Sequence, residues 1–390
     1  MVKKLRVFLF SDALGWEIVT KYHFMESELP YRMPVRTQFG YSSTAVPTIL
    51  SGEPPTRHGH FSFFFFDREG KSPFRFFRHI HWMLHPSKIF DNHRIRHRLS
   101  GFLKKHFKFT GYFSLYRVPY SRLPYFDYCE KNDIFAAHGL GEAVPNLRDM
   151  LEASGISYHI SDWHRTDEEN LAEATRLISV GGTSFLFVYT AGIDGMLHFH
   201  VNEPDYVANR LADFAERVNV LISTARGTCP DDWSVTVFSD HGMTPLAGSV
   251  DMKSRIEKLN LKFGRDYAAA YDSTMMRVWF LKEEYRDKII DAVKNAPGHW
   301  LSEEEKKELH VDFPDRRYGD GIFLLDPGVQ LVPSDMGAKP IPGMHGYSPA
   351  DRDSEASLLS TRPFPYRPSS IAGFFTLMKL AAAEIGEADE

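Results

Sequence analysis

Three short segments dominated by apolar residues, widely separated along the chain, each lead into an acidic residue. The segments cover residues 7–10, 184–189 and 234–238. The acidic residues that follow them are Asp12, Asp194 and Asp240. Continuous apolar runs of this kind are typical of strands buried on both faces, as in a parallel sheet covered by helices. Because ligands bind beyond the carboxyl ends of strands in such sheets, we expect the three carboxylates to gather at one edge.

Helical patterns separate these strands and set the fold class. Residues 170–178 and 204–225 have the apolar spacing of amphipathic helices. Strands that alternate with helices predict an α/β fold with an open, mostly parallel sheet. Hydrophobic residues make up 43% of the 390 residues, which is enough for a large core.

Composition also restricts the compartment and the partners. The two cysteines, Cys129 and Cys229, are too few for a disulfide framework or a cysteine metal site. No apolar run is long enough to cross a membrane, and the apolar stretch near the start is too short for a signal peptide. The net charge of −5 specifies no partner. We therefore expect a cytoplasmic protein, and the sequence does not predict its oligomeric state.

Histidines and hydroxyls accompany the three carboxylates. His198 follows Asp194 by four residues, which places both on one face of a helix, and His241 follows Asp240 directly. His345 lies in a glycine-rich turn. Each motif alone is common, since Asp often caps helices and glycine turns are frequent. Together with a hydroxyl turn at residues 42–44, they supply the ligand types that two zinc-like ions use to cleave phosphate esters.

The order of these motifs resembles the alkaline phosphatase superfamily. Along the chain it runs Asp, hydroxyl turn, Asp-x-x-x-His, Asp-His-Gly-Met and Gly-x-His-Gly-Tyr. It looks most like the type I phosphodiesterase/nucleotide pyrophosphatase branch. The resemblance covers the site segments and the order of the sheet, but not residues 61–128. It implies an α/β/α sandwich with two bound divalent ions.

The resemblance also implies a role for each site residue. One ion would be held by Asp194, His198 and His345. The other would be held by Asp12, Asp240, His241 and the nucleophilic hydroxyl. The nucleophile falls on Ser42, but the branch usually has Thr followed by Pro-Asn, so Ser43 and Thr44 stay open as alternatives. Imidazole and carboxylate ligands without thiolate suit Zn²⁺, with Mn²⁺ as the second choice.

The expected activity is that of a two-metal phosphoryl hydrolase, in the form of a phosphodiesterase or nucleotide pyrophosphatase. A metal-activated Ser42 would attack phosphorus, form a phosphoseryl intermediate and release the alcohol, and water would then free the phosphate. Two alternatives stay open. One is a phosphomonoesterase or phosphonate hydrolase. The other is a membrane-associated phosphotransferase that acts on a lipid-linked or sugar phosphate.

Residues 61–128 differ in composition from the rest of the chain. They hold 13 Lys or Arg against four Asp or Glu, and 14 of the 31 Phe residues. Because they interrupt the α/β pattern, we predict an inserted cap there and a small α/β lobe at residues 252–332. The catalytic core would then comprise residues 1–60, 129–251 and 333–390.

The cap has several interpretations. Its basic residues could contact phosphate, and these are Arg75, Arg78, Arg94, Arg96, Arg98, Lys104, Lys105 and Lys108. Its Phe residues could stack a base, hold a lipid tail or pack the cap's own core. The segment could also lie on an anionic membrane. Sequence-specific nucleic-acid binding is not expected, because no reading-helix motif is present. Residues 271–274 and 316–320 either line the substrate pocket or belong to the lobe.

Overall fold

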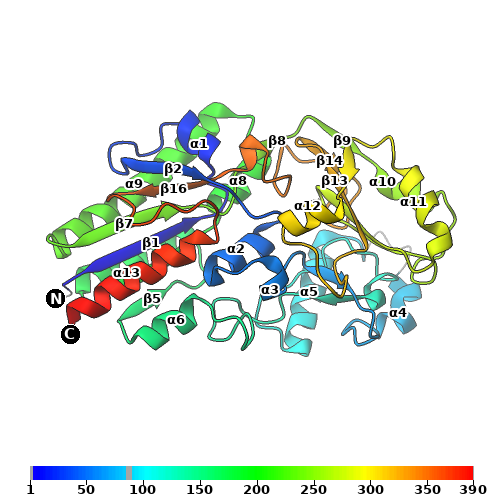
Figure 1. Ribbon diagram of the computed structural model, residues 1–390, viewed down its shortest axis with the longest axis horizontal. Helices are drawn as coiled ribbons and strands as arrows, with labels where there is room; N and C mark the ends of the chain where they lie inside the picture. The colour runs from blue at the N-terminus through cyan, green and yellow to red at the C-terminus, as the bar shows by residue number, and fades with distance from the viewer. Residues whose placement is uncertain (1–2, 85–89, 390) are drawn as a thin grey trace.

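The central sheet follows the apolar segments of the sequence. The computed structural model describes residues 3–84 and 90–389 (Figure 1). The strands of the sheet are β1 (Leu5–Ser11), β2 (Tyr31–Val35), β5 (Tyr158–Ile160), β6 (Phe185–Thr190), β7 (Trp233–Phe238) and β16 (Ala356–Ser360). Their order is β2-β16-β7-β1-β6-β5, with β5, β6, β1 and β7 parallel and β16 antiparallel to both its neighbours. The predicted mostly parallel sheet is confirmed.

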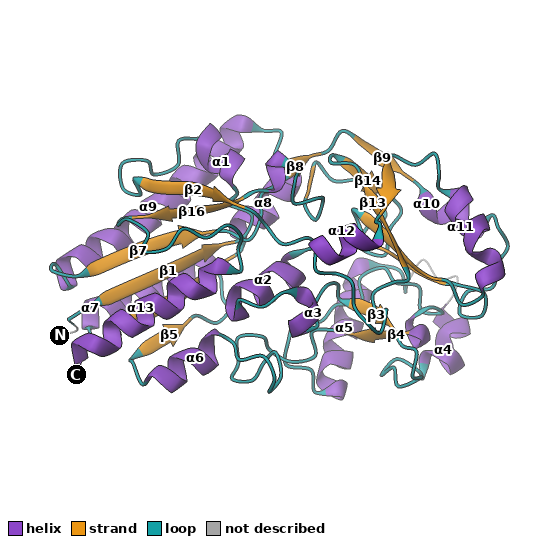
Figure 2. Ribbon diagram, in the orientation of Figure 1, coloured by secondary structure: helices purple, strands orange, loops and turns teal. Residues whose placement is uncertain are grey.

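Helices cover both faces of this sheet (Figure 2). Those on one face are α1 (Trp16–Lys21), α7 (Asp167–Val180), α8 (Gly192–His200) and α9 (Pro204–Thr228). Those on the other are α2 (Ser42–Ser51), α6 (Leu147–Ser154) and α13 (Gly373–Asp389). Val7 and Leu9 of β1 pack with the first set, while Phe8 and Phe10 pack with the second. The strands are apolar throughout because alternate side chains enter two different cores.

A second, antiparallel sheet lies beyond the carboxyl ends of the central strands. Its strands, in spatial order, are β10 (Ala268–Tyr271), β11 (Met275–Trp279), β13 (Gly321–Leu325) and β12 (Gly298–Trp300). The helices beside it are α10 (Met252–Glu257), η2 (Glu283–Tyr285), α11 (Arg286–Ala292) and α12 (Glu303–Glu308). Two small pairings connect it to the core, β9 (Gly248–Val250) with β14 (Val329–Leu331) and β8 (Thr244–Pro245) with β15 (Gly343–Met344).

The predicted cap shares its core with this second sheet. Its elements are β3 (Phe64–Phe66), α4 (Phe77–Leu84), α5 (His93–Phe107), η1 (Leu123–Tyr125) and β4 (Phe126–Tyr128). Residues 85–89 of the predicted cap lie outside the described residues. The rings of Phe66 and Phe126 lie 5.4 and 5.8 Å from that of Trp279. The three-part division stays a proposal, in which cap and lobe are joined by one aromatic core.

A buried arginine links cap and lobe. The Arg277 side chain is fully buried, and its Nε lies 2.6 Å from an Asp272 carboxylate oxygen. The same guanidinium donates to the Phe64 carbonyl at 2.9 Å and to the Ser62 hydroxyl at 2.9 Å. Because a buried charge needs several partners to offset its desolvation, this network fixes the cap strand against the lobe.

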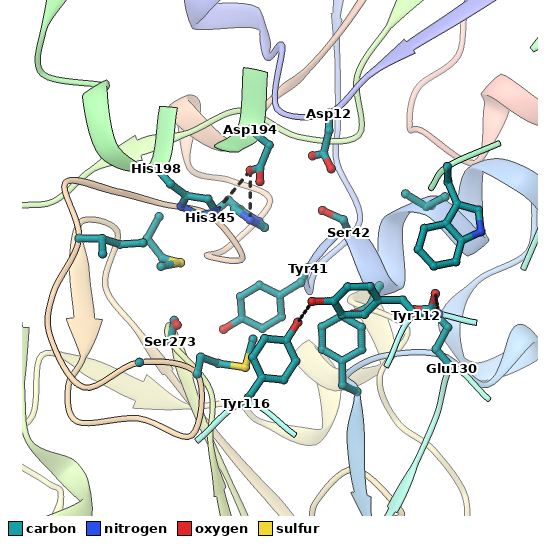
Figure 3. A pocket seen from close by; sticks show the side chains of 18 of the residues that line it. Asp12, Tyr41, Ser42, Tyr112, Tyr116, Glu130, Asp194, His198, Ser273 and His345 are labelled. Atoms are coloured by element: carbon teal, nitrogen blue, oxygen red, sulfur yellow. Dashed lines mark hydrogen bonds and ion pairs between the residues drawn. The ribbon is translucent and has the colours of Figure 1, made fainter. Parts of the chain in front are cut away.

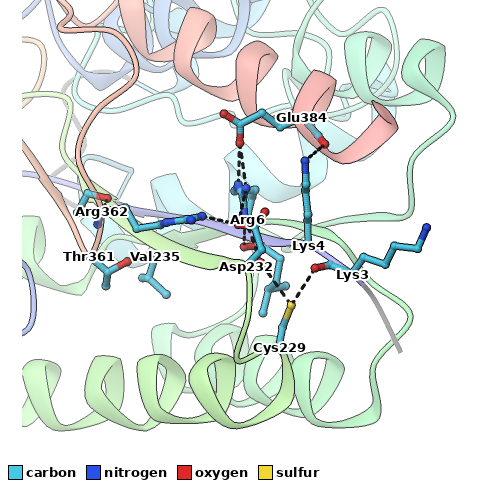
Figure 4. Close-up of polar contacts among 11 residues, drawn as sticks. Lys3, Lys4, Arg6, Cys229, Asp232, Val235, Thr361, Arg362 and Glu384 are labelled. Carbon is cyan, nitrogen blue, oxygen red and sulfur yellow. Dashed lines mark hydrogen bonds and ion pairs between the residues drawn. The ribbon is translucent and has the colours of Figure 1, made fainter. Parts of the chain in front are cut away.

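The opposite end of the central sheet is fastened by ion pairs (Figure 4). Arg6 of β1 lies 2.8 Å from Asp232, just before β7, and 2.9 Å from Glu384 of α13. Arg362 also pairs with Asp232, and Lys4 donates to the Glu384 carbonyl at 2.7 Å. These contacts hold α13 against the amino ends of the strands, away from the carboxylates.

The remaining helical turns are α3 (Pro55–His58) and η3 (Arg352–Ser354). Among the described residues, none of the helices combines the length and apolar character needed to cross a membrane.

Candidate metal centre and active site

The three carboxylates gather at the carboxyl edge of the central sheet, as the strand pattern predicts (Figure 3). Asp12 follows β1 and Asp240 follows the neighbouring strand β7. Asp194 lies in the first turn of α8, which follows β6 on the other side of β1. The helical spacing brings His198 Nε2 within 3.4 Å of Asp194 Oδ1.

His241 lies in the middle of the cluster. Its Nδ1 donates to the Gly242 carbonyl at 2.8 Å, so its Nε2 carries no proton in the neutral ring. That Nε2 lies 3.4 Å from Asp12 Oδ1 and 3.3 Å from Asp240 Oδ2. The other oxygen of Asp240 accepts backbone N–H groups of Ala13 and His241, which leaves Oδ2 facing the cluster.

A second pair of imidazoles completes the group. His345 follows β15, and the pairing of β15 with β8 holds its loop beside the one that carries His241. The His241 and His345 rings stack at 3.8 Å, and His345 Nε2 lies 3.6 Å from Asp194 Oδ1. His198 Nδ1 donates to the Gly343 carbonyl at 2.9 Å, which fixes its tautomer and leaves Nε2 facing Asp194.

The buried charges of the cluster lack compensation from the protein. Asp12 Oδ1, Asp194 Oδ1 and Asp240 Oδ2 are buried and accept no hydrogen bond from the residues that the structure describes. Burial and the neighbouring Asp240 raise the pKa of Asp12 well above its usual value, and burial raises the pKa of Asp194. Burial and the nearby His241 lower the pKa of His345. Oxygen and nitrogen atoms that converge with unmet charge are the arrangement that bound cations require.

Two sets of donor atoms are close enough to hold an ion each. Asp12, Asp240 and His241 form one set, and Asp194, His241 and His345 form the other, with all donor atoms of a set within 4.8 Å of one another. His241 therefore bridges the two sets in this geometry. The position of His198 beside Asp194 is consistent with the predicted set of Asp194, His198 and His345, and that assignment stays a proposal.

The three candidate hydroxyls have different surroundings. Ser42 is the first residue of α2, and its hydroxyl lies 3.0 Å from the unprotonated Nε2 of His241, to which it donates. Thr44 instead donates to the Phe61 carbonyl. The Ser43 hydroxyl is buried and has no hydrogen-bond partner among the described residues. Among these three hydroxyls, therefore, the Ser42 hydroxyl is the one that contacts the carboxylate–imidazole cluster of the described residues.

A cavity of about 560 Å³ opens in front of the cluster. Asp12, Ser42, Asp194, His198 and His345 line one side of it. Phe63, Tyr112, Tyr116, Glu130 and Trp163 form a mostly aromatic wall of the same cavity, and Tyr112, Tyr116 and Glu130 lie across it from Asp194 (Figure 3). Ring centroids in this wall are 5.3 to 6.4 Å apart, so it presents a nearly continuous aromatic surface.

One carboxyl group interrupts the aromatic wall. Glu130 is buried, and one of its oxygens accepts the Tyr112 backbone N–H at 3.3 Å. Burial raises the pKa of Glu130 to about 8. The wall therefore combines ring faces with one carboxyl group that titrates near neutral pH.

The interpretation in which the basic cap residues contact phosphate finds no support in the lining of this cavity. None of the eight arginines and lysines singled out in the cap is among its lining residues. Arg96, for example, is buried and pairs with Asp91 at 2.8 Å. Lys104 contacts the wall of the cavity, with its ammonium 5.2 Å from the ring centroid of Trp163. The cap contributes aromatic side chains instead, and its high Phe and Tyr content was the available signal.

Residues 271–274 and 316–320 were expected either to line the substrate pocket or to belong to the lobe, and the structure shows both outcomes. Ser273 lines the cavity, and Thr274 is hydrogen-bonded to the Tyr41 hydroxyl at 2.8 Å. Asp272 pairs with Arg277 in the lobe, and residues 316–320 are not among the lining residues. Sequence reasoning missed Glu130 and Trp163, because both lie in irregular segments without a motif.

Comparison with known proteins agrees with the fold and the motifs. The sequence profile of the type I phosphodiesterase/nucleotide pyrophosphatase family matches residues 35–348. No curated protein sequence matches the chain. Murine ectonucleotide pyrophosphatase/phosphodiesterase 5 superposes with a TM-score of 0.67 at 15% identity, covering 97% of this chain and 95% of the other.

Two further solved structures superpose equally well. An inactive variant of the murine protein in complex with AMP gives a TM-score of 0.66 at 15% identity, covering 98% of this chain and 95% of the other. The human protein gives 0.66 at 13% identity, with 97% and 95% covered. These similarities show the alkaline phosphatase-like fold, and the profile spans most of the sequence. The chain therefore belongs to the type I phosphodiesterase/nucleotide pyrophosphatase family, metal-dependent enzymes that act on phosphate esters.

Proposed function

We propose that this enzyme is a two-metal phosphodiesterase that cleaves nucleotide-type phosphodiesters through a phosphoseryl intermediate on Ser42. The observation that carries the proposal is the position of the Ser42 hydroxyl, 3.0 Å from His241 Nε2 at the edge of the buried carboxylates. Ser42 also begins α2, where the helix dipole and free N–H groups favour a phosphoryl group.

The residues present fit two divalent ions. One ion would be held by Asp12, Asp240, His241 and Ser42. The other would be held by Asp194, His198 and His345. Zn²⁺ suits carboxylate and imidazole ligands without thiolate, and Mn²⁺ is the alternative. When bound, the ions would lower the pKa of the nucleophile and neutralise charge on the phosphoryl oxygens.

The protein's own groups would act in two displacements. In the first, Ser42 Oγ forms a bond to phosphorus while the bond from phosphorus to the leaving alcohol breaks. In the second, water attacks the phosphoseryl phosphorus, which frees the phosphate monoester and restores the Ser42 hydroxyl. The loops that hold His241 and His345 keep the imidazoles in place through both steps, since β8 and β15 pair beside them.

The aromatic wall would hold the organic part of the substrate. Phe63, Tyr112 and Trp163 contribute aromatic rings to the wall of the cavity. Aromatic rings stack on nucleobases. AMP is bound in the structure of the related murine protein, which supports a nucleotide as the substrate class.

Turnover of two chromogenic esters tests the proposal. The metal-loaded enzyme should cleave bis-p-nitrophenyl phosphate faster than p-nitrophenyl phosphate, and a chelator should abolish both activities. Faster cleavage of the monoester would replace the proposal with a phosphomonoesterase. Transfer to glycerol or sugar acceptors in preference to water would replace it with a phosphotransferase.

We also propose a cytoplasmic location, which the low cysteine content supports. The chain has only two cysteines, Cys129 and Cys229, too few for a disulfide framework, and so low a content suits a reducing compartment. Fractionation of cells that express the chain would test it, and recovery in an oxidising compartment would contradict it.

A further inference from the structure

An apolar groove runs between the two helices of the cap, on its outer side. Its volume is about 510 Å³. Side chains from both helices line it, among them Phe77, Ile80, Leu84, Leu99, Phe102 and Leu103. In Figure 1 both helices lie in the half of the molecule away from the two termini. None of the lining residues belongs to the cavity in front of the metal cluster.

Large apolar side chains are exposed on the two helices that line this groove. Trp82 is 68% exposed, Phe102 is 66% exposed and Met83 is 56% exposed. These three are among the most exposed large apolar residues in the described part of the chain, and all belong to α4 or α5. Scattered surface apolar residues need no explanation, but a cluster beside an apolar groove indicates an interaction surface.

The same helices carry a strong positive charge. The sequences of α4 and α5 contain six Lys or Arg residues and no Asp or Glu. Arg98 and Lys105 lie four residues before and three residues after Phe102, so helical spacing places the three on one face. Both basic side chains are exposed, and neither forms an ion pair with any described residue.

From these features we infer that the outer face of α4 and α5 docks on an anionic lipid surface. Trp82, Met83 and Phe102 would enter the boundary between headgroups and acyl chains, and Arg98 and Lys105 would contact the anionic headgroups. Basic residues beside exposed Trp and Phe are the composition of helices that lie in this boundary. The exposed Met and the apolar groove argue against a nucleic acid, whose phosphates and bases offer no acyl-like partner.

The position of α5 relates this surface to the active site. Leu103 faces the groove, while the next residue, Lys104, reaches Trp163 in the wall of the catalytic cavity. One helix therefore borders both spaces. Docking would bring the cavity close to lipid headgroups, and it does not depend on the phosphodiesterase proposal.

Vesicle co-sedimentation of the metal-loaded enzyme tests the inference. Binding to vesicles of phosphatidylcholine mixed with phosphatidylserine should exceed binding to phosphatidylcholine alone and should fall as salt rises. Replacing Arg98 and Lys105 together by Gln should weaken binding roughly 25-fold, at about fivefold for each charge. Trp82→Ala and Phe102→Ala should each weaken it roughly tenfold.

Matched controls come from the opposite end of the molecule. Lys379 and Leu380 are an exposed basic and an exposed apolar residue on α13, and Lys379→Gln and Leu380→Ala should leave binding unchanged. Turnover of a soluble diester should stay normal in every variant, because none of these residues lines the catalytic cavity.

Three outcomes would overturn the inference. The first is equal binding to the two kinds of vesicle, and the second is equal loss in the cap and control variants. The third is a dimer in solution that Phe102→Ala dissociates without any effect on lipid binding, which would assign the face to a second copy of the chain.

Discussion

The buried carboxyl group in the cavity wall makes stability depend on pH. Glu130 is 7% exposed, and burial raises its pKa to about 8 from the 4.5 of an ordinary Glu. Between these two pH values the folded protein holds a proton that the unfolded chain has released. The stabilising effect of that proton is complete below pH 4.5, and it is lost as the pH rises from 4.5 to about 8.

The size of the effect follows from the pKa difference. A difference from 4.5 to about 8 corresponds to about 4 to 5 kcal/mol of folding free energy lost across the window. Replacing Glu130 by Gln keeps the shape of the side chain and removes the titration. At pH 5 the variant should match the unsubstituted enzyme within about 1 kcal/mol. At pH 9 it should be the more stable protein by about 3 to 4 kcal/mol.

Urea unfolding of both proteins at the two pH values measures the difference, with identical metal concentrations throughout. Glu142 provides the control, because its side chain is 88% exposed. The Glu142→Gln variant should follow the unsubstituted enzyme at both pH values. A Glu130→Gln difference that is the same at pH 5 and pH 9 would refute the reasoning.

Three further predictions concern the lobe and the metal centre. Arg277→Met should lower the free energy of unfolding, measured by urea denaturation, by about 3 to 5 kcal/mol, because the substitution leaves the Asp272 carboxylate buried without its cation. A loss under about 1 kcal/mol would contradict this and would show that water replaces the guanidinium. Asp240→Asn should lower both metal content, measured by atomic emission, and turnover, whereas full metal content would remove Asp240 from the ligands. A chelator should lower the midpoint of thermal unfolding, since ions bound only to the folded state stabilise it, and an unchanged midpoint would contradict a metal centre at this edge.

Much of the core could be predicted from the sequence because it depends on local patterns. The apolar segments of β1, β6 and β7 are short and continuous, and the side chains that follow them reach the same edge of the sheet for geometric reasons. The helical spacing of Asp194 and His198 likewise fixes their proximity. The choice of Ser42 over Thr44 as the nucleophile required the structure, because the structure shows that the Thr44 hydroxyl donates its hydrogen bond to the Phe61 carbonyl.

The cap could not be predicted in the same way. Its aromatic residues carry no regular period, and the partners of Phe66 and Phe126 are side chains of a strand about 150 to 210 residues later in the chain, in the lobe. The sequence therefore suggested a separate cap and lobe, and it left the role of the basic residues open between phosphate contact and other interpretations. In the structure the aromatic residues turn toward the catalytic cavity and the lobe, and most of the positive charge faces outward. Tertiary packing, rather than local preference, decides this arrangement.

The identity of the nucleophile tests the proposed chemistry most directly. Turnover of bis-p-nitrophenyl phosphate should be measured for the unsubstituted enzyme and for Ser42→Ala, Ser43→Ala and Thr44→Val, with metal content determined on the same samples. Ser42→Ala should lower kcat by roughly a thousand-fold or more while the protein keeps most of its metal, and the other two variants should stay active. An active Ser42→Ala enzyme beside an inactive Ser43→Ala or Thr44→Val enzyme would contradict the proposed phosphoseryl mechanism at Ser42.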